Sequence, residues 1–195
     1  MIDNQEMKQS DFIETVSSFE ECIITQYISS AKYSSEIYQG TANTIRVVTA
    51  KDIDSSSNDY QVLLTFHRFG NDKSWPCDNM SSGGLFALIG SDGIIGRART
   101  ITEPGKIYDT HPDTGAQISG VKIPNFADVL NKLLNVHKSF MYYNFFAWDI
   151  VISSDGKFYV LEINRGCDLD SQMCTPFRNE KFGQYMRRNK LLDSR

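Results

Sequence analysis

Residues 145–165 read FFAWDIVISSDGKFYVLEINR, two apolar runs on either side of Asp155-Gly156. An Asp-Gly pair between such runs is a strong short-range signal of a β-hairpin, because both residues tolerate positive φ angles. A two-residue turn at this pair predicts cross-strand partners along the whole hairpin. The expected pairs are Ser154 with Lys157, Ile152 with Tyr159, Ile150 with Leu161, and Asp149 with Glu162.

The pairing of Asp149 with Glu162 places two carboxylates side by side on one face, which is destabilising unless something neutralises them. Asn164 follows Glu162 by two residues and therefore points to the same face. A set of oxygen ligands from Asp149, Glu162 and Asn164 suits a hard cation such as Mg²⁺. The alternative interpretation is that each carboxylate pairs with its own Lys or Arg.

At these residues the chain resembles the ATP-grasp family, in which an Asp on one strand and a Glu-x-Asn on the next hold the Mg²⁺ ions of ATP. Further motifs narrow the resemblance to the sugar-transfer-associated ATP-grasp branch, which is related to the alpha-L-glutamate ligases. These motifs are residues 43–49, Asp78-Asn79 followed by Gly83-Gly84, residues 111–115, Ile123-Pro124 and Gln172. The resemblance extends from about Glu20 to Gln172.

The resemblance implies an α/β (α+β) fold with a largely antiparallel sheet flanked by helices. Residues 1–195 are then a single domain, similar to the hinge strand and the large C-terminal subdomain of ATP-grasp. Only about twenty residues precede the expected hinge strand, fewer than the N-terminal lid subdomain of the family needs, given usual element lengths. The lid is therefore expected to be absent, and the chain alone is expected to bind Mg-ATP weakly.

The implied activity is that of an ATP- and Mg²⁺-dependent carboxylate ligase, or a fragment of one. Such a ligase forms an acyl phosphate that an amine or another nucleophile attacks. The implied partners are a nucleotide, a small-molecule carboxylate or sugar-linked substrate, and either a second copy of the chain or a missing lid segment. Cell-surface polysaccharide biosynthesis is the implied setting. Two alternatives stay open: a catalytically inactive ATP-grasp-like binding module, and a nucleotide-free carbohydrate-binding or interaction domain.

The resemblance assigns catalytic roles to Arg46, Asp149, Glu162 and Asn164. Arg46 lies in an expected strand over residues 44–50, where Ile45, Val47 and Thr49 face the other way. The planar guanidinium of arginine suits a phosphate or a substrate carboxylate. The alternative is an exposed arginine on the surface or on an edge strand.

The nucleotide is expected to contact Arg46, Asn79 and the hinge strand. Residues 22–28 are expected to form this hinge strand as a buried strand, and by resemblance the backbone at Gln26, Tyr27 and Ile28 binds the adenine edge. A plain core strand fits the composition equally well. Asn79 is expected to contact the ligand, with an Asx-type turn as its alternative.

Other patterns predict supporting elements and one further candidate residue. Helices are expected over residues 10–21, over residues 126–142 with Val129, Leu133, Val136 and Phe140 on one stripe, and in a basic, solvated tail over residues 182–192. Further strands are expected over residues 60–69, 85–89 and 94–102. His111 is either an acid–base group or, as is more common for a histidine in a Pro-Gly loop, a packing residue.

Composition excludes several classes of protein. The formal net charge of −4 provides no electrostatic footprint for nucleic acid. No apolar run approaches the length of a membrane span, and the polar N-terminus lacks the features of a signal peptide. The four cysteines form no CxxC pair, so free thiols in a reducing cytoplasm are expected.

Overall fold

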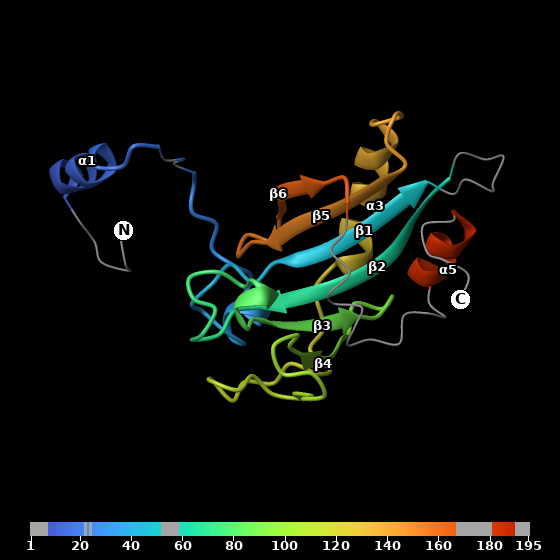
Figure 1. The fold of residues 1–195 in the computed structure, drawn as a ribbon, viewed down its shortest axis with the longest axis horizontal. Coiled ribbons are helices and arrows are strands. Elements are labelled where there is room, and N and C mark those ends of the chain that lie inside the picture. The colour runs from blue at the N-terminus through green and yellow to red at the C-terminus, as the bar shows by residue number, and fades with distance from the viewer. Residues whose placement is uncertain (1–7, 22, 24, 52–58, 167–180, 190–195) are drawn as a thin grey trace.

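The computed structural model describes residues 8–21, 23, 25–51, 59–166 and 181–189. These residues contain a six-stranded sheet in the order β4-β3-β2-β1-β5-β6, and every neighbouring pair of strands is antiparallel. The strands are β1 (Ile45–Lys51), β2 (Tyr60–Phe69), β3 (Leu85–Ile89), β4 (Ile95–Arg99), β5 (Phe145–Ile152) and β6 (Phe158–Asn164). The fold is therefore α+β with an antiparallel sheet, as expected from the sequence (Figure 1).

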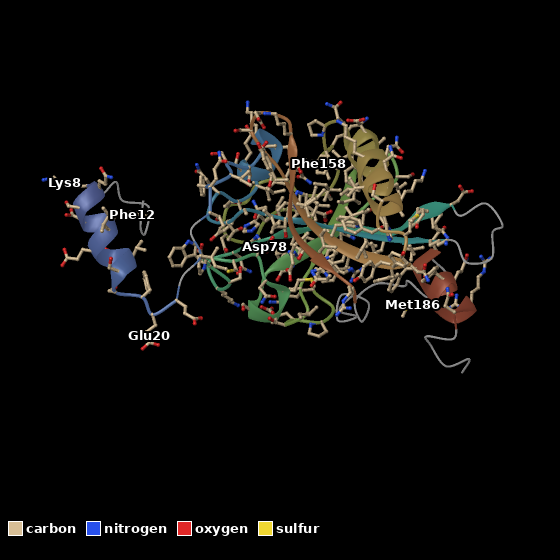
Figure 2. The ribbon with its side chains drawn as sticks, turned by 90° about the horizontal axis from the view of Figure 1, so that it is seen from above. Lys8, Phe12, Glu20, Asp78, Phe158 and Met186 are labelled. Carbon is tan, nitrogen blue, oxygen red and sulfur yellow. The ribbon has the colours of Figure 1, made fainter. Side chains whose placement is uncertain are left out.

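Helix α3 (Phe126–Lys138) covers one face of the sheet and closes the main hydrophobic core. Figure 2 shows α3 and the short α2 (Lys32–Ser35) on the same side of the strands. Phe126, Val129 and Leu133 of α3 pack in one cluster with alternate residues of the strands. These strand residues include Ile45, Val47, Leu85, Ala87, Phe146, Trp148 and Ile150. Ile45 and Val47 therefore face α3, and Arg46 between them faces the other side, which we call the polar face.

The buried stripe of α3 ends in His137, whereas Val136 and Phe140, which the sequence placed on this stripe, are 42 % and 40 % exposed. His137 Nδ1 lies 2.7 Å from Thr49 Oγ1, and its Nε2 lies 3.1 Å from the Tyr143 carbonyl oxygen. The helix stops at Lys138 and not near residue 142, because the chain turns back after His137 to bring the Tyr143 carbonyl to this ring. Burial lowers the pKa of His137, so the imidazole is neutral near pH 7.

Helix α5 (Lys181–Arg188) packs on the polar face at one end of the sheet. Phe182 and Tyr185 are buried against Val48, Ala50 and Ala147. The expected tail helix is thus present, but the expectation of a solvated face is wrong, because its aromatic side chains cover apolar strand residues. Residues 190–192 lie outside the described part of the chain.

The hairpin of β5 and β6 keeps one expected pair and loses the others. Ser153 N donates to the Lys157 carbonyl, so three residues, 154–156, form the loop in place of the expected two. Gly156 adopts a φ of +79°, which fits a type I turn followed by a left-handed residue. Ile152 therefore pairs with Phe158, and Ile150 with Val160. A register shift between Asp149 and Ile150 then restores the pairing of Asp149 with Glu162.

The expected hinge strand is absent from residues 25–28, which form no strand and are exposed or half-buried; Tyr27 is 78 % exposed. Cys22 and Ile24 lie outside the described residues. Helix α1 (Gln9–Ser17) precedes this stretch, ends short of residue 21 and buries none of its side chains. Figures 1 and 2 show α1 apart from the sheet. The apolar side chains of Phe12, Ile13 and Val16, which recur at helical spacing, therefore have no partner in the described part of the chain.

Among the described helices, none combines the length and the apolar character that crossing a membrane requires.

Candidate functional site

Three polar side chains form a row across three adjacent strands on the polar face. Arg46 of β1 pairs with Asp149 of β5, and Asp149 pairs in turn with Glu162 of the edge strand β6. Asn164 follows Glu162 by two residues and lies opposite Ala147. The row exists because all three strands are antiparallel neighbours in a register that aligns these positions. The geometry expected for Asp149, Glu162 and Asn164 is therefore present.

Asp149 lies between two arginines. Arg46 binds the carboxylate in a bidentate way: its Nε donates to Oδ1, and its Nη2 donates to Oδ2 at 2.9 Å. Arg68, near the end of β2, places its Nη2 3.2 Å from the same Oδ2. The side chains of Asp149, Arg46 and Arg68 are only 6 %, 12 % and 14 % exposed. A buried charge needs partners of this kind, and here two cations surround one carboxylate.

Asp78 supplies a second carboxylate and ties a loop to the cluster. Its Oδ2 accepts hydrogen bonds from Thr44 N and Thr44 Oγ1, each at 2.6 Å, and lies 3.7 Å from Arg68 Nε. Thr44 Oγ1 also accepts a hydrogen bond from Arg68 Nε at 2.7 Å. Thr44 thus connects Asp78 to Arg68. We call Arg46, Arg68, Asp78 and Asp149 the arginine–aspartate cluster.

At Gly84 the chain comes close to the backbone that carries Asp78. A Cβ atom on Gly84 would lie 2.8 Å from both the Asp78 and the Asn79 carbonyl oxygens. The turn continues through a short 3₁₀ helix, η1 (Met80–Ser82), whose Met80 packs on Phe66 and Phe86 of the polar face. Gly84 therefore lets this loop lie close enough to the sheet for Asp78 to reach Thr44. Figure 2 labels Asp78 in this position.

Gly84→Ala should lower the free energy of unfolding by about 1–3 kcal/mol, the usual cost of overpacking, because the new methyl group meets two backbone oxygens. Gly166→Ala is the matched control, since a Cβ there meets no atom of the described residues within 4 Å. Urea denaturation of both variants measures the difference. Equal stability of the two variants would contradict the tight packing at Gly84.

The residues of the row fit Mg²⁺ in ligand type. Asp149 and Glu162 offer carboxylate oxygens and Asn164 an amide oxygen, and the side chain of Glu162 is exposed with no hydrogen bond or ion pair to another described residue. Asp149, however, already holds two guanidinium groups. Among the described residues, no group of three or more His, Cys, Asp or Glu side chains gathers at one point. A cation would therefore rely on two carboxylates and the Asn164 amide.

The other residues expected to contact the nucleotide or to mark the family do not belong to the arginine–aspartate cluster. Asn79 Oδ1 accepts a hydrogen bond from Ser81 N at 3.3 Å and caps η1, which matches the Asx-type alternative. Gln26, Tyr27 and Ile28 lie in the exposed stretch before α2, so their contacts with adenine stay a prediction. Gln172 lies outside the described residues.

His111 is a packing residue. It is 1 % exposed, its Nε2 donates to the Gly70 carbonyl at 2.8 Å, and its Nδ1 accepts from Asp113 N at 3.3 Å. Its ring stacks on Tyr38. Both nitrogens are thus used to hold residues 111–115 against the loop after β2, and the acid–base alternative for His111 is not supported.

A cavity lined by described residues lies away from the arginine–aspartate cluster. It measures about 650 Å³ and lies between residues 62–65 of β2, the β3–β4 hairpin and Leu130. None of the residues assigned to the site from the sequence lines it. The cluster itself lies on the polar face of the sheet, with its side chains largely buried.

A family model described as sugar-transfer-associated ATP-grasp matches residues 5–176, and the chain belongs to this family. No curated protein and no solved structure gives a significant match. Family membership supports ATP binding and a ligase-type activity in general terms, and it agrees with the resemblance found in the sequence.

Sequence reasoning missed Arg68 and Asp78 as members of the site. Arg68, like Arg46, is an arginine within a largely apolar strand sequence. A charged residue at such a position needs a partner if it is buried, and this signal could have identified Arg68. Asp78 was part of the Asp78-Asn79 motif, but no pattern in the sequence indicated its contacts with Thr44 and Arg68. Its role depends on a loop that folds back over 34 residues to reach Thr44.

Proposed function

We propose that this chain binds ATP with Mg²⁺ on the polar face of the sheet and forms the catalytic part of a ligase that activates carboxylates. The observation that carries the proposal is the row of Arg46, Asp149 and Glu162 across three strands. It sets an anion-binding guanidinium beside two carboxylates in a chain that belongs to an ATP-grasp family.

In this proposal a substrate carboxylate oxygen attacks the γ-phosphorus of ATP, and ADP leaves. An amine or another nucleophile then attacks the acyl carbon of the acyl phosphate, and inorganic phosphate leaves. Phosphoryl transfer depends on positioning and on stabilising negative charge, so no nucleophilic side chain is required. Arg46 and Arg68 bind phosphate oxygens through their forks as charge accumulates.

Asp149, Glu162 and Asn164 would hold Mg²⁺, which supplies positive charge to the phosphates when bound. Glu162 is the most accessible of the three because it lies exposed on the edge strand. Thr44 and Asp78 keep Arg68 aimed at the same point.

The family's description refers to sugar transfer, and as part of the proposal we infer a role in assembling sugar-containing polymers of the cell surface. The substrates are then a small-molecule carboxylate or a sugar-linked acceptor. A second copy of the chain is a further partner in this proposal.

A catalytically inactive binding module is the second candidate. The specific observation in its favour is that the arginines already neutralise Asp149, as in a purely structural ion pair. The two candidates differ in one measurable property: only the first requires Glu162 for metal-dependent nucleotide binding.

Glu162→Gln should weaken Mg²⁺-dependent binding of a non-hydrolysable ATP analogue by about tenfold or more, because one charged ligand of the cation is lost. Asp128→Asn, which removes an equal charge from α3, should leave binding unchanged. Calorimetric titration with Mg²⁺ and with EDTA measures the metal-dependent part. Equal affinities in both variants and the wild type would favour the inactive module.

A further inference from the structure

The carboxylate of Asp149 has little capacity left for a cation. A carboxylate offers about four lone-pair sites. Contacts from arginine nitrogens already occupy three of them, two from Arg46 and one from Arg68. The group is also nearly buried. A metal ion that binds Asp149 must therefore displace at least one guanidinium group or share an oxygen with it.

The same guanidinium groups are suitable donors for phosphate. The arginine fork binds phosphate and carboxylate oxygens with the same geometry. Arg46 and Arg68 come from adjacent strands and converge on one oxygen, Asp149 Oδ2. An anion arriving at this point offers both arginines an alternative partner. Thr44 and Asp78 bind the Nε atom of Arg68, while its Nη2 contacts Asp149. The Nη2 group can therefore change its partner without moving the rest of the side chain.

We propose, resting on the function proposed above, that phosphate and metal bind this cluster by an exchange of partners. In the free protein, Arg46 and Arg68 occupy the carboxylate of Asp149 and keep a cation from binding it. The polyphosphate of the nucleotide draws the arginines off the carboxylate, and the released Asp149 joins Glu162 in binding the cation. Each ligand then raises the affinity of the other by the same factor, because binding free energies are linked reciprocally. Arg68, like Arg46, contacts the phosphate directly in this scheme.

The arginine side chains themselves provide a direct readout. In ¹⁵N spectra of the wild-type protein, Mg²⁺ alone should leave the Nε–H signals of Arg46 and Arg68 in place, whereas Mg²⁺ with tripolyphosphate should shift both. Arg46→Lys and Arg68→Lys assign the two signals. Tripolyphosphate carries no adenine, so the test does not depend on the hinge. Unmoved signals under conditions where calorimetry shows binding would overturn the exchange.

The coupling can also be measured through metal affinity, with Mn²⁺ followed by electron paramagnetic resonance. In the wild type, saturating tripolyphosphate should tighten Mn²⁺ binding by about tenfold or more, within the usual range of coupling between sites. In Arg68→Met, Mn²⁺ alone should bind about tenfold more tightly than in the wild type, and the effect of tripolyphosphate should shrink. A coupling factor near one in the wild type would overturn the proposal.

Arg99→Met is the matched control for the loss of a positive charge. Phe86 of β3 pairs with Arg68 of β2 on one side and with Arg99 of β4 on the other. Arg99 is half-buried, and its side chain makes no hydrogen bond or ion pair with another described residue. Removing its charge should change Mn²⁺ affinity much less than Arg68→Met does. Equal effects of the two variants would mean that net charge, and not contact with Asp149, controls the metal, and the exchange would be wrong.

The inference and the proposed function fail in different ways. Suppose that tripolyphosphate with Mg²⁺ shifts the arginine signals but no ATP analogue binds in a Mg²⁺-dependent way. This result would support the exchange of partners and overturn the proposed function. Glu162-dependent binding of the analogue with static arginine signals would overturn the exchange alone. Absence of any binding of Mn²⁺ and tripolyphosphate at millimolar concentration would overturn both.

Discussion

Asp149→Ala should lower the free energy of unfolding by about 3–5 kcal/mol, the usual cost of removing one partner from a buried ion pair. The variant removes the carboxylate on which Arg46 and Arg68 converge, and their side chains are only 12 % and 14 % exposed. A typical domain is stable by about 5–15 kcal/mol, so the loss is a large fraction of the total. Urea denaturation followed by circular dichroism measures it.

Two companion variants separate charge from shape. Asp149→Asn keeps the size of the side chain and loses its charge, so it should lose much of the same stability. Glu162→Ala removes an exposed carboxylate of the same row and should change stability by less than about 0.5 kcal/mol, as usual for surface positions. A loss of less than about 1 kcal/mol in Asp149→Ala would show that the arginines do not depend on this carboxylate.

Acidification should destabilise the protein between about pH 6.5 and pH 4, mainly through His67. This residue is fully buried: its Nδ1 donates to the Arg68 carbonyl and its Nε2 accepts from the Tyr33 hydroxyl, both at 3.0 Å. Burial lowers the pKa of His67 to about 4. Because the unfolded chain binds the proton from about pH 6.5 downwards and the folded protein resists it, stability present above pH 6.5 is lost as the pH falls.

The full effect of this one group is about 3 kcal/mol, from a pKa difference of roughly 2.5 units at 1.36 kcal/mol each. His137, whose pKa burial also lowers, adds to it in the same direction. Urea denaturation of the wild type and of His67→Gln at pH 7, 5.5 and 4.5 checks the assignment. A pH dependence that persists undiminished in His67→Gln would show that other groups are responsible.

The hairpin shows how far a sequence pattern determines a register. The Asp-Gly signal correctly indicated a hairpin and the pairing of Asp149 with Glu162. The loop length was wrong, because a glycine with positive φ fits both a two-residue turn and a three-residue loop. The register shift near Asp149 compensated for the longer loop. No local pattern marks that shift, since its position depends on pairing with β1 as well.

Strand and helix positions followed from periodicity where a sheet face or a helix stripe is buried. The alternation of Ile45, Arg46 and Val47 correctly assigned faces in β1. Periodicity failed for α1 and α5 in opposite directions: the stripe of α1 packs on no described residue, whereas Phe182 of α5 is buried. An apolar stripe indicates that a helix face can be buried. Whether another element packs on that face depends on the tertiary structure.

The site was predictable in its residue types and only partly in its partners. Oxygen ligands at Asp149 and Glu162 followed from hairpin geometry. The bond between Arg46 and Asp149 joins residues 103 positions apart, and no local rule in one sequence connects them. The sequence had left open whether these carboxylates bind a metal or pair with arginines. In the structure Asp149 pairs with two arginines, and Glu162 remains accessible.

The central claim is that metal and nucleotide bind on the polar face at Asp149 and Glu162. Paramagnetic broadening by Mn²⁺ tests it most directly, in ¹⁵N spectra of the wild-type protein recorded with a non-hydrolysable ATP analogue. We expect the amide signals of residues 147–150 and 161–164 to broaden first and those of residues 88–96, beside the 650 Å³ cavity, to stay sharp. Broadening centred on residues 88–96, or no localised broadening at all, would contradict it.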